Sequence, residues 1–262
     1  MTDAALPGPA VGLSGGGAMP LLGFGTWQLQ GREAYAAVRS ALDVGYRHLD
    51  TATIYRNEAE VGRAIRDSGV PRAEVFVTTK LPPQRAGAER ATLERSLTDL
   101  GVDAVDLWLV HWPPHRGAGT STWEAFLDLQ REGLVRDIGV SNYDLDLVDE
   151  LVGATGTAPA VDQVRWGPSL HDPRFAAGLV ERGVVLEGYS PFKSTRLRDP
   201  VLGRIARAHG VTTTQVVVRW HLQHGFVVIP KSARPERIAA NADVFGFALS
   251  DDEMAAIDGM GR

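Results

Sequence analysis

Short apolar runs rich in β-branched residues alternate along the chain with longer amphipathic segments. Eight of these runs have the length and composition of β-strands. Segments 32–45 and 88–101, which lie between runs, space their apolar residues as one face of a helix does. Alternating strands and helices predict a parallel sheet, with strands expected within residues 21–25, 46–50, 75–80, 105–111, 135–142, 160–164, 184–190 and 226–232.

Eight strand–helix units with no Gly- or Ser-rich linker between two halves favour an α/β fold of the closed (β/α)8 type, a TIM barrel. We expect residues 1–262 to form this single domain, with residues 1–9 flexible. An open doubly wound sheet is the competing architecture, but the fingerprint G-x-G-x-x-G is missing, because neither 15–17 nor 23–25 is followed by its last glycine at the needed spacing. Residues 11–20 predict a short β-hairpin that closes the bottom of the barrel.

Local signals mark several helix ends. Asn57 followed by Glu60, and Ser250 followed by Glu253, have the spacing of capping boxes. Three glycines directly follow helical patterns, where a left-handed residue commonly ends a helix; they are Gly45, Gly101 and Gly210.

Composition excludes several classes of function. The net charge is −5 with mixed signs and no basic tail, so we expect no nucleic-acid partner. The chain has no cysteine, which excludes disulfides and thiolate chemistry, and we expect no metal site. The first ten residues lack the pattern of a signal peptide, and no apolar run approaches the about 18 residues of a membrane span. We therefore expect a cytoplasmic protein, with nothing in the sequence demanding more than a monomer.

Polar residues recur where the predicted strands end. In a βα barrel the C-terminal strand ends and the loops after them form the active face. Such a run of polar groups at one end of apolar strands is unusual for packing alone. The candidates are Asp50, with Tyr55 in the loop after it, then Lys80, His111, Ser141, Asn142, Gln163, Tyr189, Ser190, Lys231 and Ser232.

The first four candidates suggest a mechanism. If Asp50 holds Lys80 and Lys80 faces the Tyr55 hydroxyl, the cation favours the phenolate and we expect the pKa of Tyr55 to fall. Such a tyrosine can protonate a developing alkoxide, while His111 orients the carbonyl oxygen. The hydride must come from a cofactor, because no side chain supplies one.

Other interpretations remain open at this point. A buried Asp–Lys pair is often structural, and a lysine at a strand end also suits a Schiff-base lyase with Lys80 as nucleophile. A cofactor-binding protein without enzymatic activity is a third possibility.

Lysine positions are informative in their own right, since only Lys80, Lys193 and Lys231 are lysines among 27 basic residues, and lysine shifts its pKa more readily than arginine.

Together these motifs resemble the aldo-keto reductase family, in particular its shorter bacterial members such as the 2,5-diketo-gluconate reductases. The resemblance runs from about residue 10 to the last residue. It rests on MPLLGFGTWQL (19–29), GYRHLDTATIYRNEAEVG (45–62), TTKLPP (78–83), VDLWLVHWP (105–113), IGVSNY (138–143) and VIPKSARPERIAANADVFGF (228–247).

The resemblance implies roles for individual residues. Tyr55 is the expected proton donor with Lys80 and Asp50 as its partners, and His111 orients the carbonyl. Tyr55 and His111 also contact the substrate, between apolar walls formed by Trp27 and Trp112. The nicotinamide carboxamide is held by Ser141, Asn142 and Gln163, its ring stacks on Tyr189, and Gly25, Thr26 and Trp27 lie beside the cofactor.

The implied cofactor is NADPH (NADP⁺). Lys231, Ser232 and Arg237 match the group around the adenosine 2′-phosphate, which suits a point charge, a hydroxyl and a guanidinium fork. Asn241 lies near the adenine, and Arg234 adds to the phosphate site or stacks on the adenine. The segment 190–194 passes the pyrophosphate, where Ser190 is a contact and Lys193 either pairs with phosphate or points to water.

Three departures from the family pattern affect the expected specificity. Ala240 stands where many members have a glutamate that contacts the adenine, and Leu81-Pro82 replaces a common Lys-aromatic pair. The sequence ends at Arg262 without the tail that covers the pocket in specific members. We therefore expect an open pocket that accepts aldehydes, ketones and dicarbonyls and reduces them to alcohols.

Overall fold

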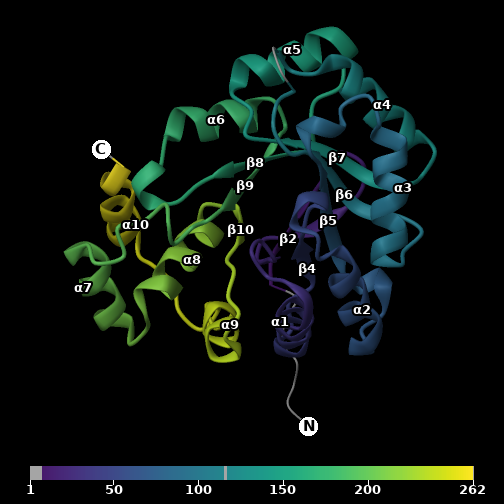
Figure 1. Ribbon diagram of the computed structural model, residues 1–262. Helices are drawn as coiled ribbons and strands as arrows, with labels where there is room; N and C mark the ends of the chain where they lie inside the picture. The colour runs from purple at the N-terminus through teal and green to yellow at the C-terminus, as the bar shows by residue number, and fades with distance from the viewer. Residues whose placement is uncertain (1–7, 115–116, 262) are drawn as a thin grey trace.

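The computed structural model describes residues 8–114 and 117–261 (Figure 1). The prediction that residues 1–9 are flexible therefore falls, apart from Gly8 and Pro9, outside the described residues.

Eight parallel strands form the centre of the molecule, each paired with its neighbour in chain order. They are β3 (Phe24–Gly25), β4 (His48–Asp50), β5 (Phe76–Leu81), β6 (Val105–Val110), β7 (Val135–Ser141), β8 (Val161–Arg165), β9 (Val185–Tyr189) and β10 (Val227–Ile229). The last strand returns to the first: Gly23 N donates to Val228 O over 2.9 Å, and Val228 N donates to Leu21 O over 2.8 Å. These bonds close the sheet and confirm the predicted TIM barrel.

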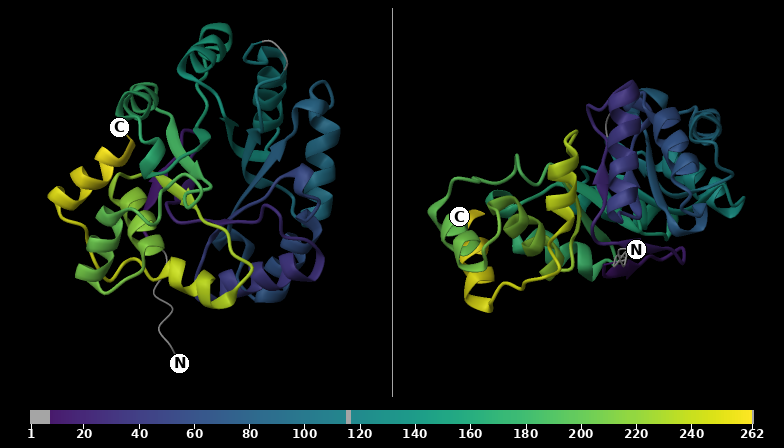
Figure 2. Two further views of the ribbon diagram at one scale, coloured as in Figure 1. Left: turned by 60° about the vertical axis from the view of Figure 1, so that its left-hand side comes forward. Right: turned by 90° about the horizontal axis from the view of Figure 1, so that it is seen from below.

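Helices surround the barrel (Figures 1 and 2). Most of them bury an apolar stripe, and two of them, α7 and α8, occupy the connection between β9 and β10. The ten are α1 (Gly31–Val44), α2 (Glu58–Ser68), α3 (Glu89–Leu100), α4 (Thr120–Arg131), α5 (Leu145–Thr155), α6 (Pro173–Glu181), α7 (Pro200–His209), α8 (Thr213–Gln223), α9 (Pro235–Ala242) and α10 (Asp251–Asp258), counted over the described residues.

The predicted hairpin is formed by β1 (Ala10–Gly12) and β2 (Ala18–Pro20), which pair antiparallel beneath the barrel (Figure 2, right). Its turn is fastened to β7, because the backbone N–H groups of Gly15 and Gly17 donate to the carboxylate of Asp137 over 2.6 and 3.0 Å. A Cβ atom at either glycine would lie 2.4–2.5 Å from that carboxylate. The glycine run at 15–17 therefore permits this close approach, and the hairpin closes the bottom as predicted.

Most of the predicted helix ends are confirmed. Gly45, Gly101 and Gly210 are left-handed, with φ of 111°, 69° and 67°. Ser250 and Glu253 form a reciprocal capping box at the start of α10.

The capping box predicted at Asn57 is wrong. Asn57 precedes α2, but its side chain makes no bond to the helix. Its amide instead donates to the backbone oxygens of Thr26 and Leu29, both over 3.0 Å, and accepts from the Thr51 hydroxyl over 2.7 Å. These bonds give both the nitrogen and the oxygen of the buried carboxamide hydrogen-bond partners. A helix cap, in which the oxygen accepts from one backbone N–H, would leave the nitrogen without a partner.

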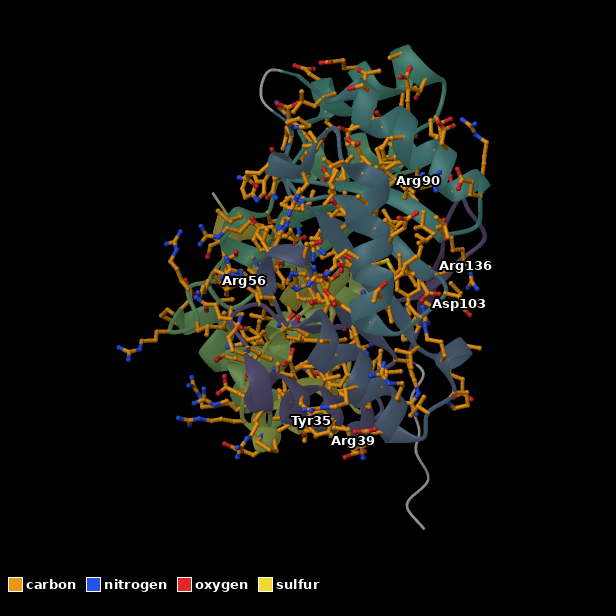
Figure 3. All side chains as sticks on the ribbon, turned by 45° about the vertical axis from the view of Figure 1, so that its right-hand side comes forward. Tyr35, Arg39, Arg56, Arg90, Asp103 and Arg136 are labelled. Atoms are coloured by element: carbon orange, nitrogen blue, oxygen red, sulfur yellow. The ribbon has the colours of Figure 1, made fainter. Side chains whose placement is uncertain are left out.

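Charged side chains on the outer helices face solvent and pair locally (Figure 3). Arg90 of α3 forms an ion pair with Glu132, and Arg39 of α1 forms one with Asp43. No helix among the described residues combines the length and apolar character needed to cross a membrane.

Candidate active site

A cavity of about 670 Å³ opens at the C-terminal ends of the barrel strands. Most of the residues that the sequence selected line it, which brings together segments as distant as residues 25 and 231. The predicted site residues in its wall are Gly25, Trp27, Asp50, Tyr55, His111, Trp112, Ser141, Asn142, Gln163, Tyr189, Ser190, Lys193 and Lys231. All three lysines of the chain lie here, since Lys193 and Lys231 line the cavity and Lys80 lies beneath it.

A buried ion pair forms the floor of the cavity. Lys80 on β5 donates from Nζ to Asp50 Oδ2 on β4 over 2.6 Å and to the Thr51 backbone oxygen over 2.8 Å. Lys80 is fully buried and Asp50 is 2% exposed. Burial works to lower the pKa of Lys80, but Asp50 and Tyr55 raise it and the net shift is upward. Lys80 therefore keeps its positive charge.

Tyr55 lies above this pair at the end of the short 3-10 turn η1 (Thr53–Tyr55). Lys80 Nζ is 5.3 Å from the centre of its ring, and the His111 ring packs edge-on at 5.8 Å. Burial raises the pKa of Tyr55 and Lys80 lowers it, with a net rise to about 12. The expected fall in the pKa of Tyr55 is therefore wrong, because desolvation of the phenolate outweighs the attraction of Lys80, which Asp50 partly offsets. At neutral pH the phenol holds its proton.

His111 follows β6 and is 7% exposed. Burial, with a smaller effect from Lys80, lowers its pKa to about 3, so the imidazole is neutral. Its Nδ1 atom is buried and has no hydrogen-bond partner among the described residues. A neutral imidazole can donate one N–H to an oxygen in the cavity without carrying charge.

Residues at the C-terminal ends of β7 and β9 form a connected polar group on one side of the cavity. Tyr189 donates from its hydroxyl to Asn142 Oδ1 over 2.8 Å, and Asn142 Nδ2 donates to Ser141 Oγ over 2.9 Å and to the His111 backbone oxygen over 3.2 Å. Asn142 and Ser190 adopt left-handed φ angles of 65° and 52°. Non-glycine residues rarely do so, and such strain concentrates at functional sites.

Gln163 on β8 bonds to the buried ion pair at the floor of the cavity. Its side-chain amide donates to Asp50 Oδ2 over 2.8 Å, and its backbone oxygen accepts from the Ser141 hydroxyl over 2.7 Å. Gln163 thus links the ion pair to the polar group around Asn142. Thr26, by contrast, is fully buried and lies outside the cavity wall, with its hydroxyl bonded to the Asp50 backbone oxygen over 2.9 Å.

Exposed aromatic side chains stand at the mouth of the cavity. Trp27 is 45% and Trp112 is 48% exposed. The Lys193 ammonium lies over the Trp27 ring, with Nζ 4.7 Å from the ring centre, so in this structure it points to the mouth of the cavity. Ile54, which is 51% exposed, lines the same wall. The sequence analysis missed Ile54, because an apolar residue in a loop carries no strand-end signal.

Arg165 also lines the cavity and was missed. It ends β8, two residues after Gln163, and its guanidinium donates to the Lys193 backbone oxygen over 3.2 Å and to Ser194 Oγ over 3.3 Å. Polar residues were selected where each predicted strand ends; a selection that ran two residues beyond Gln163 would have included Arg165.

A group of cations follows β10. Lys231 and Ser232 were predicted to end this strand, but it ends at Ile229, because the prolyl nitrogen of Pro230 cannot extend the ladder. Ser232 Oγ accepts from the Arg234 backbone N–H over 3.1 Å, just before α9. Arg234 and Arg237 are exposed and, like Lys231, form no ion pair with a described residue. Ser232, Arg234, Arg237 and Asn241 lie outside the cavity wall.

Further ionisable groups lie inside the barrel, and the sequence analysis did not select them. Glu187 on β9 is fully buried, and its Oε1 lies 3.7 Å from Nε2 of the equally buried His48. Burial, with a smaller effect from Asp50, raises the pKa of Glu187 to about 8. Burial lowers the pKa of His48 to about 3. Both groups are therefore uncharged at neutral pH.

A second cavity of about 630 Å³ lies between α2, α3 and the start of β6. Its wall includes Asp103 and Arg136, which lie on the outer face in Figure 3. The guanidinium of Arg72 in this wall already bonds to Asp106 over 2.7 Å, and Arg66 donates to the Leu100 backbone oxygen over 3.0 Å. Arg66 and Arg72 therefore already bond to acceptors of the protein, and the cavity at the strand ends, which is lined by most of the predicted site residues, is the candidate site.

Comparison with known proteins agrees with this arrangement. A family model described as "Aldo/keto reductase family" matches residues 21–262. The chain belongs to this family. The resemblance predicted from the motifs is thereby confirmed, and this aldo-keto reductase is an oxidoreductase that acts on carbonyl groups.

Relatives and solved structures cover nearly the whole chain. An aldo-keto reductase of Mycolicibacterium smegmatis is 44% identical over 253 residues, which are 95% of this chain and 92% of the relative. 2,5-Diketo-D-gluconic acid reductase B of Corynebacterium sp. is 44% identical over 259 residues, or 97% and 94%. An aldo/keto reductase structure from Brucella melitensis has a TM-score of 0.92 at 39% identity, covering 96% of this chain and 99% of that one. A Bombyx mori aldo-keto reductase in complex with NADP has a TM-score of 0.91 at 32% identity, covering 98% and 94%.

Proposed function

We propose that this aldo-keto reductase reduces aldehydes, ketones or dicarbonyls to alcohols with NADPH, and that Tyr55 donates the proton. The observation that carries the proposal is a protonated phenol held in a cavity above a buried ion pair, with a neutral imidazole beside it. Tyr55 and His111 donate toward the substrate oxygen, and Lys80 stabilises the phenolate that remains after proton transfer.

The residues present fit a nicotinamide dinucleotide phosphate. Lys231, Arg234 and Arg237 are cations without ion-pair partners among the described residues, gathered where α9 begins, which suits a phosphate. We assign the carboxamide to Ser141, Asn142 and Gln163, the nicotinamide ring to Tyr189, and the remaining contacts to Gly25, Thr26, Trp27, Ser190, Ser232 and Asn241. NADPH supplies the hydride when bound. The complex of the Bombyx mori relative with NADP supports this choice.

The substrate class follows from the cavity walls. Trp27, Trp112 and Ile54 are large, exposed and apolar, so the mouth offers surface to many organic groups and fixes none of them by charge. Relatives at 44% identity are named for a keto-sugar acid and for morphine, which differ greatly in shape. Both facts support broad acceptance. All the residues assigned to proton transfer and to the cofactor belong to the same chain, so we also propose that a monomer is active.

The alternatives fit less well. A Schiff-base lyase needs an accessible, neutral lysine, whereas Lys80 is fully buried, bonded to Asp50, and has a raised pKa. A protein that only binds the cofactor would have no use for the protonated Tyr55 above this pair.

Replacement of Tyr55 tests the proposal. Tyr55→Phe removes the proton donor, so we expect NADPH-dependent turnover of a panel of aldehydes to fall by about 10² or more. NADPH binding, followed by fluorescence quenching, should be retained. Tyr35→Phe on α1 is the matched control, because the Tyr35 hydroxyl lies on the outer surface (Figure 3), where it donates to Asp67 over 2.9 Å. Full turnover in Tyr55→Phe would refute the assignment.

A further inference from the structure

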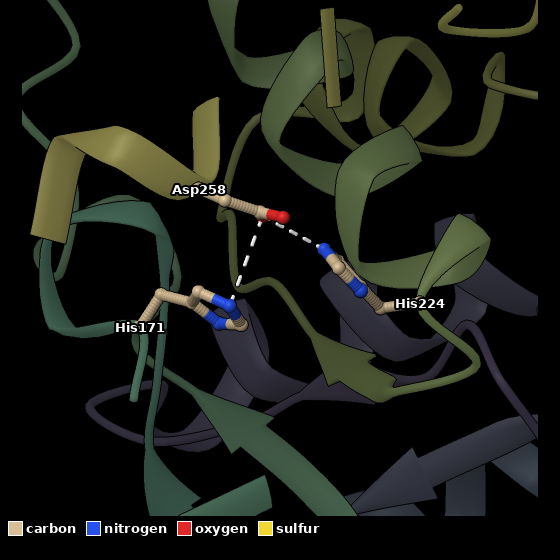
Figure 4. A group of neighbouring side chains, drawn as sticks. All are labelled: His171, His224 and Asp258. Carbon is tan, nitrogen blue, oxygen red and sulfur yellow. Dashed lines mark hydrogen bonds and ion pairs between the residues drawn. The ribbon is translucent and has the colours of Figure 1, made fainter. Parts of the chain in front are cut away.

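Two histidines and one aspartate converge outside the barrel, and none of them lines the catalytic cavity. His171 follows the short turn η4 (Pro168–Leu170), His224 directly follows α8, and Asp258 ends α10. Asp258 Oδ1 lies 2.9 Å from His224 Nε2 and 3.8 Å from His171 Nε2. One potential ligand atom from each residue lies within 4.8 Å of the other two, and Figure 4 shows the three side chains pointing toward a common centre.

Packing holds these side chains in place. The His171 ring stands edge-on against Trp220 at 5.2 Å, and the His224 ring stacks on Phe226 at 5.0 Å. Trp220 Nε1 donates to Asp258 Oδ1 over 2.8 Å and so fixes the carboxylate. Ligands that are oriented by neighbouring groups in this way lose little freedom when they bind an ion.

We propose that His171, His224 and Asp258 form a binding site for Zn²⁺ or a similar divalent transition-metal ion. Two imidazole nitrogens and one carboxylate oxygen suit these ions, whereas Mg²⁺ and Ca²⁺ prefer oxygen ligands alone. The expectation from the sequence that the chain has no metal site is at odds with this proposal. That expectation rested on the absence of cysteine, which does not bear on histidine sites.

The two separations between Asp258 and the histidines are close to what zinc needs, and the two histidine ligand atoms lie within 4.8 Å of each other. Bonds of about 2.0–2.1 Å in a tetrahedral site place neighbouring ligand atoms about 3.3 Å apart. The separation of 2.9 Å would widen and that of 3.8 Å would close, each by about half an ångström or less. The side chains of His224 and Asp258 are 23% and 29% exposed, so an ion can enter and water can occupy the fourth position.

The site would join two parts of the chain that already touch. The turn η5 (Gly259–Gly261), which follows Asp258, packs so closely on His171 that a Cβ atom at Gly261 would lie 2.8 Å from the His171 backbone oxygen. A bound ion would fasten this turn to the loop after β8. Its expected effect is stabilisation of the folded protein rather than chemistry at the cavity.

Titration of the full chain with Zn²⁺ tests the site. After treatment with a chelator, calorimetry should show one saturable Zn²⁺ site, and Mg²⁺ at the same concentration should show none. At a Zn²⁺ concentration about 100 times Kd, the unfolding midpoint should rise by about 5–10 °C. Affinity should fall as the pH is lowered, because protons compete with the ion for its ligand atoms. Absence of saturable binding to the wild-type chain would overturn the proposal.

Variants then locate the ion. His224→Gln and Asp258→Asn should each weaken Zn²⁺ binding by tenfold or more, and Asp258→Asn keeps an oxygen that can accept from Trp220. His209→Gln is the matched control, because His209 is a similarly exposed histidine that pairs with a different carboxylate, Glu253, over 3.0 Å. Equal affinity in His224→Gln and in the wild type, with both folded by circular dichroism, would show that the ion binds elsewhere and would refute the site.

Discussion

Replacement of Lys80 by methionine separates its charge from its structural role. The Nζ atom lies 5.3 Å from the centre of the Tyr55 ring. With an effective dielectric constant of about 20, a unit charge at that separation stabilises a developing phenolate by about 3 kcal/mol. Each 1.36 kcal/mol corresponds to a tenfold change in rate, so Lys80→Met should slow proton transfer from Tyr55 by about 10²-fold.

The same replacement also destabilises the fold. Asp50 would remain buried with its charge, and of its side-chain donors only Gln163, at 2.8 Å, would be left. Removing one partner of a buried ion pair costs about 3–5 kcal/mol. The double variant Asp50→Asn/Lys80→Met removes both charges and should recover most of that loss. It should not recover the rate, because the cation beside Tyr55 is still missing.

Two measurements on the same variants distinguish these effects. Single-turnover reduction of an aldehyde by bound NADPH gives the chemical rate, and urea unfolding gives the stability. We expect both variants to lose about 10² in rate and only the single variant to lose stability. If the double variant regains its rate together with its stability, Lys80 acts by supporting the structure, and the reasoning from its charge is refuted.

Two further predictions concern the cofactor and pH. Lys231→Gly should weaken NADPH binding more than NADH binding, measured by fluorescence quenching, and an equal loss for both would contradict the 2′-phosphate assignment. The buried His48 and His221 have pKa values lowered to about 3 and 4. The unfolded chain therefore binds their protons first, and each should lower the unfolding free energy by about 1.4 kcal/mol per pH unit as pH falls from 6.5 toward 4. Glu187, whose pKa is raised to about 8, acts in the opposite sense. Its contribution is complete below its unfolded pKa and is lost as pH rises toward 8, at up to about 1.4 kcal/mol per unit. Glu187→Gln should flatten this pH dependence between about pH 4.5 and 8, measured by urea unfolding at fixed pH, and an unchanged slope would contradict the assigned protonation.

The position of the candidate site could be predicted because the barrel topology places the ends of all the strands close together in space. The C-terminal ends of parallel strands meet on one face, so Asp50, Lys80 and Gln163, which lie far apart in the sequence, come within hydrogen-bond distance. Only the apolar runs and the polar residue that ends each run were needed. The hairpin glycines also followed from pattern, although their bond to Asp137 was not visible in it.

Properties that depend on burial could not be predicted in this way. The sequence indicated that Lys80 would lower the pKa of Tyr55, but the net direction depends on how much water the phenol loses. Asn57 had the spacing of a helix cap, yet its amide bonds to a loop that the pattern does not place beside it. For Tyr55 the burial, and for Asn57 the hydrogen-bond partners, come from parts of the chain that the local sequence pattern does not place.

The buried acids bear on how Lys80 can act at all. If Glu187 were ionised, the barrel interior would hold two carboxylates against one ammonium, and the excess negative charge would oppose the formation of a phenolate at Tyr55. Burial and Asp50 instead raise the pKa of Glu187, so it is protonated at neutral pH, and His48 beside it is neutral. The charges near the phenol then reduce to the pair of Lys80 and Asp50. Because Lys80 is the member with its charged atom over the Tyr55 ring, the local field favours the phenolate that proton transfer leaves behind.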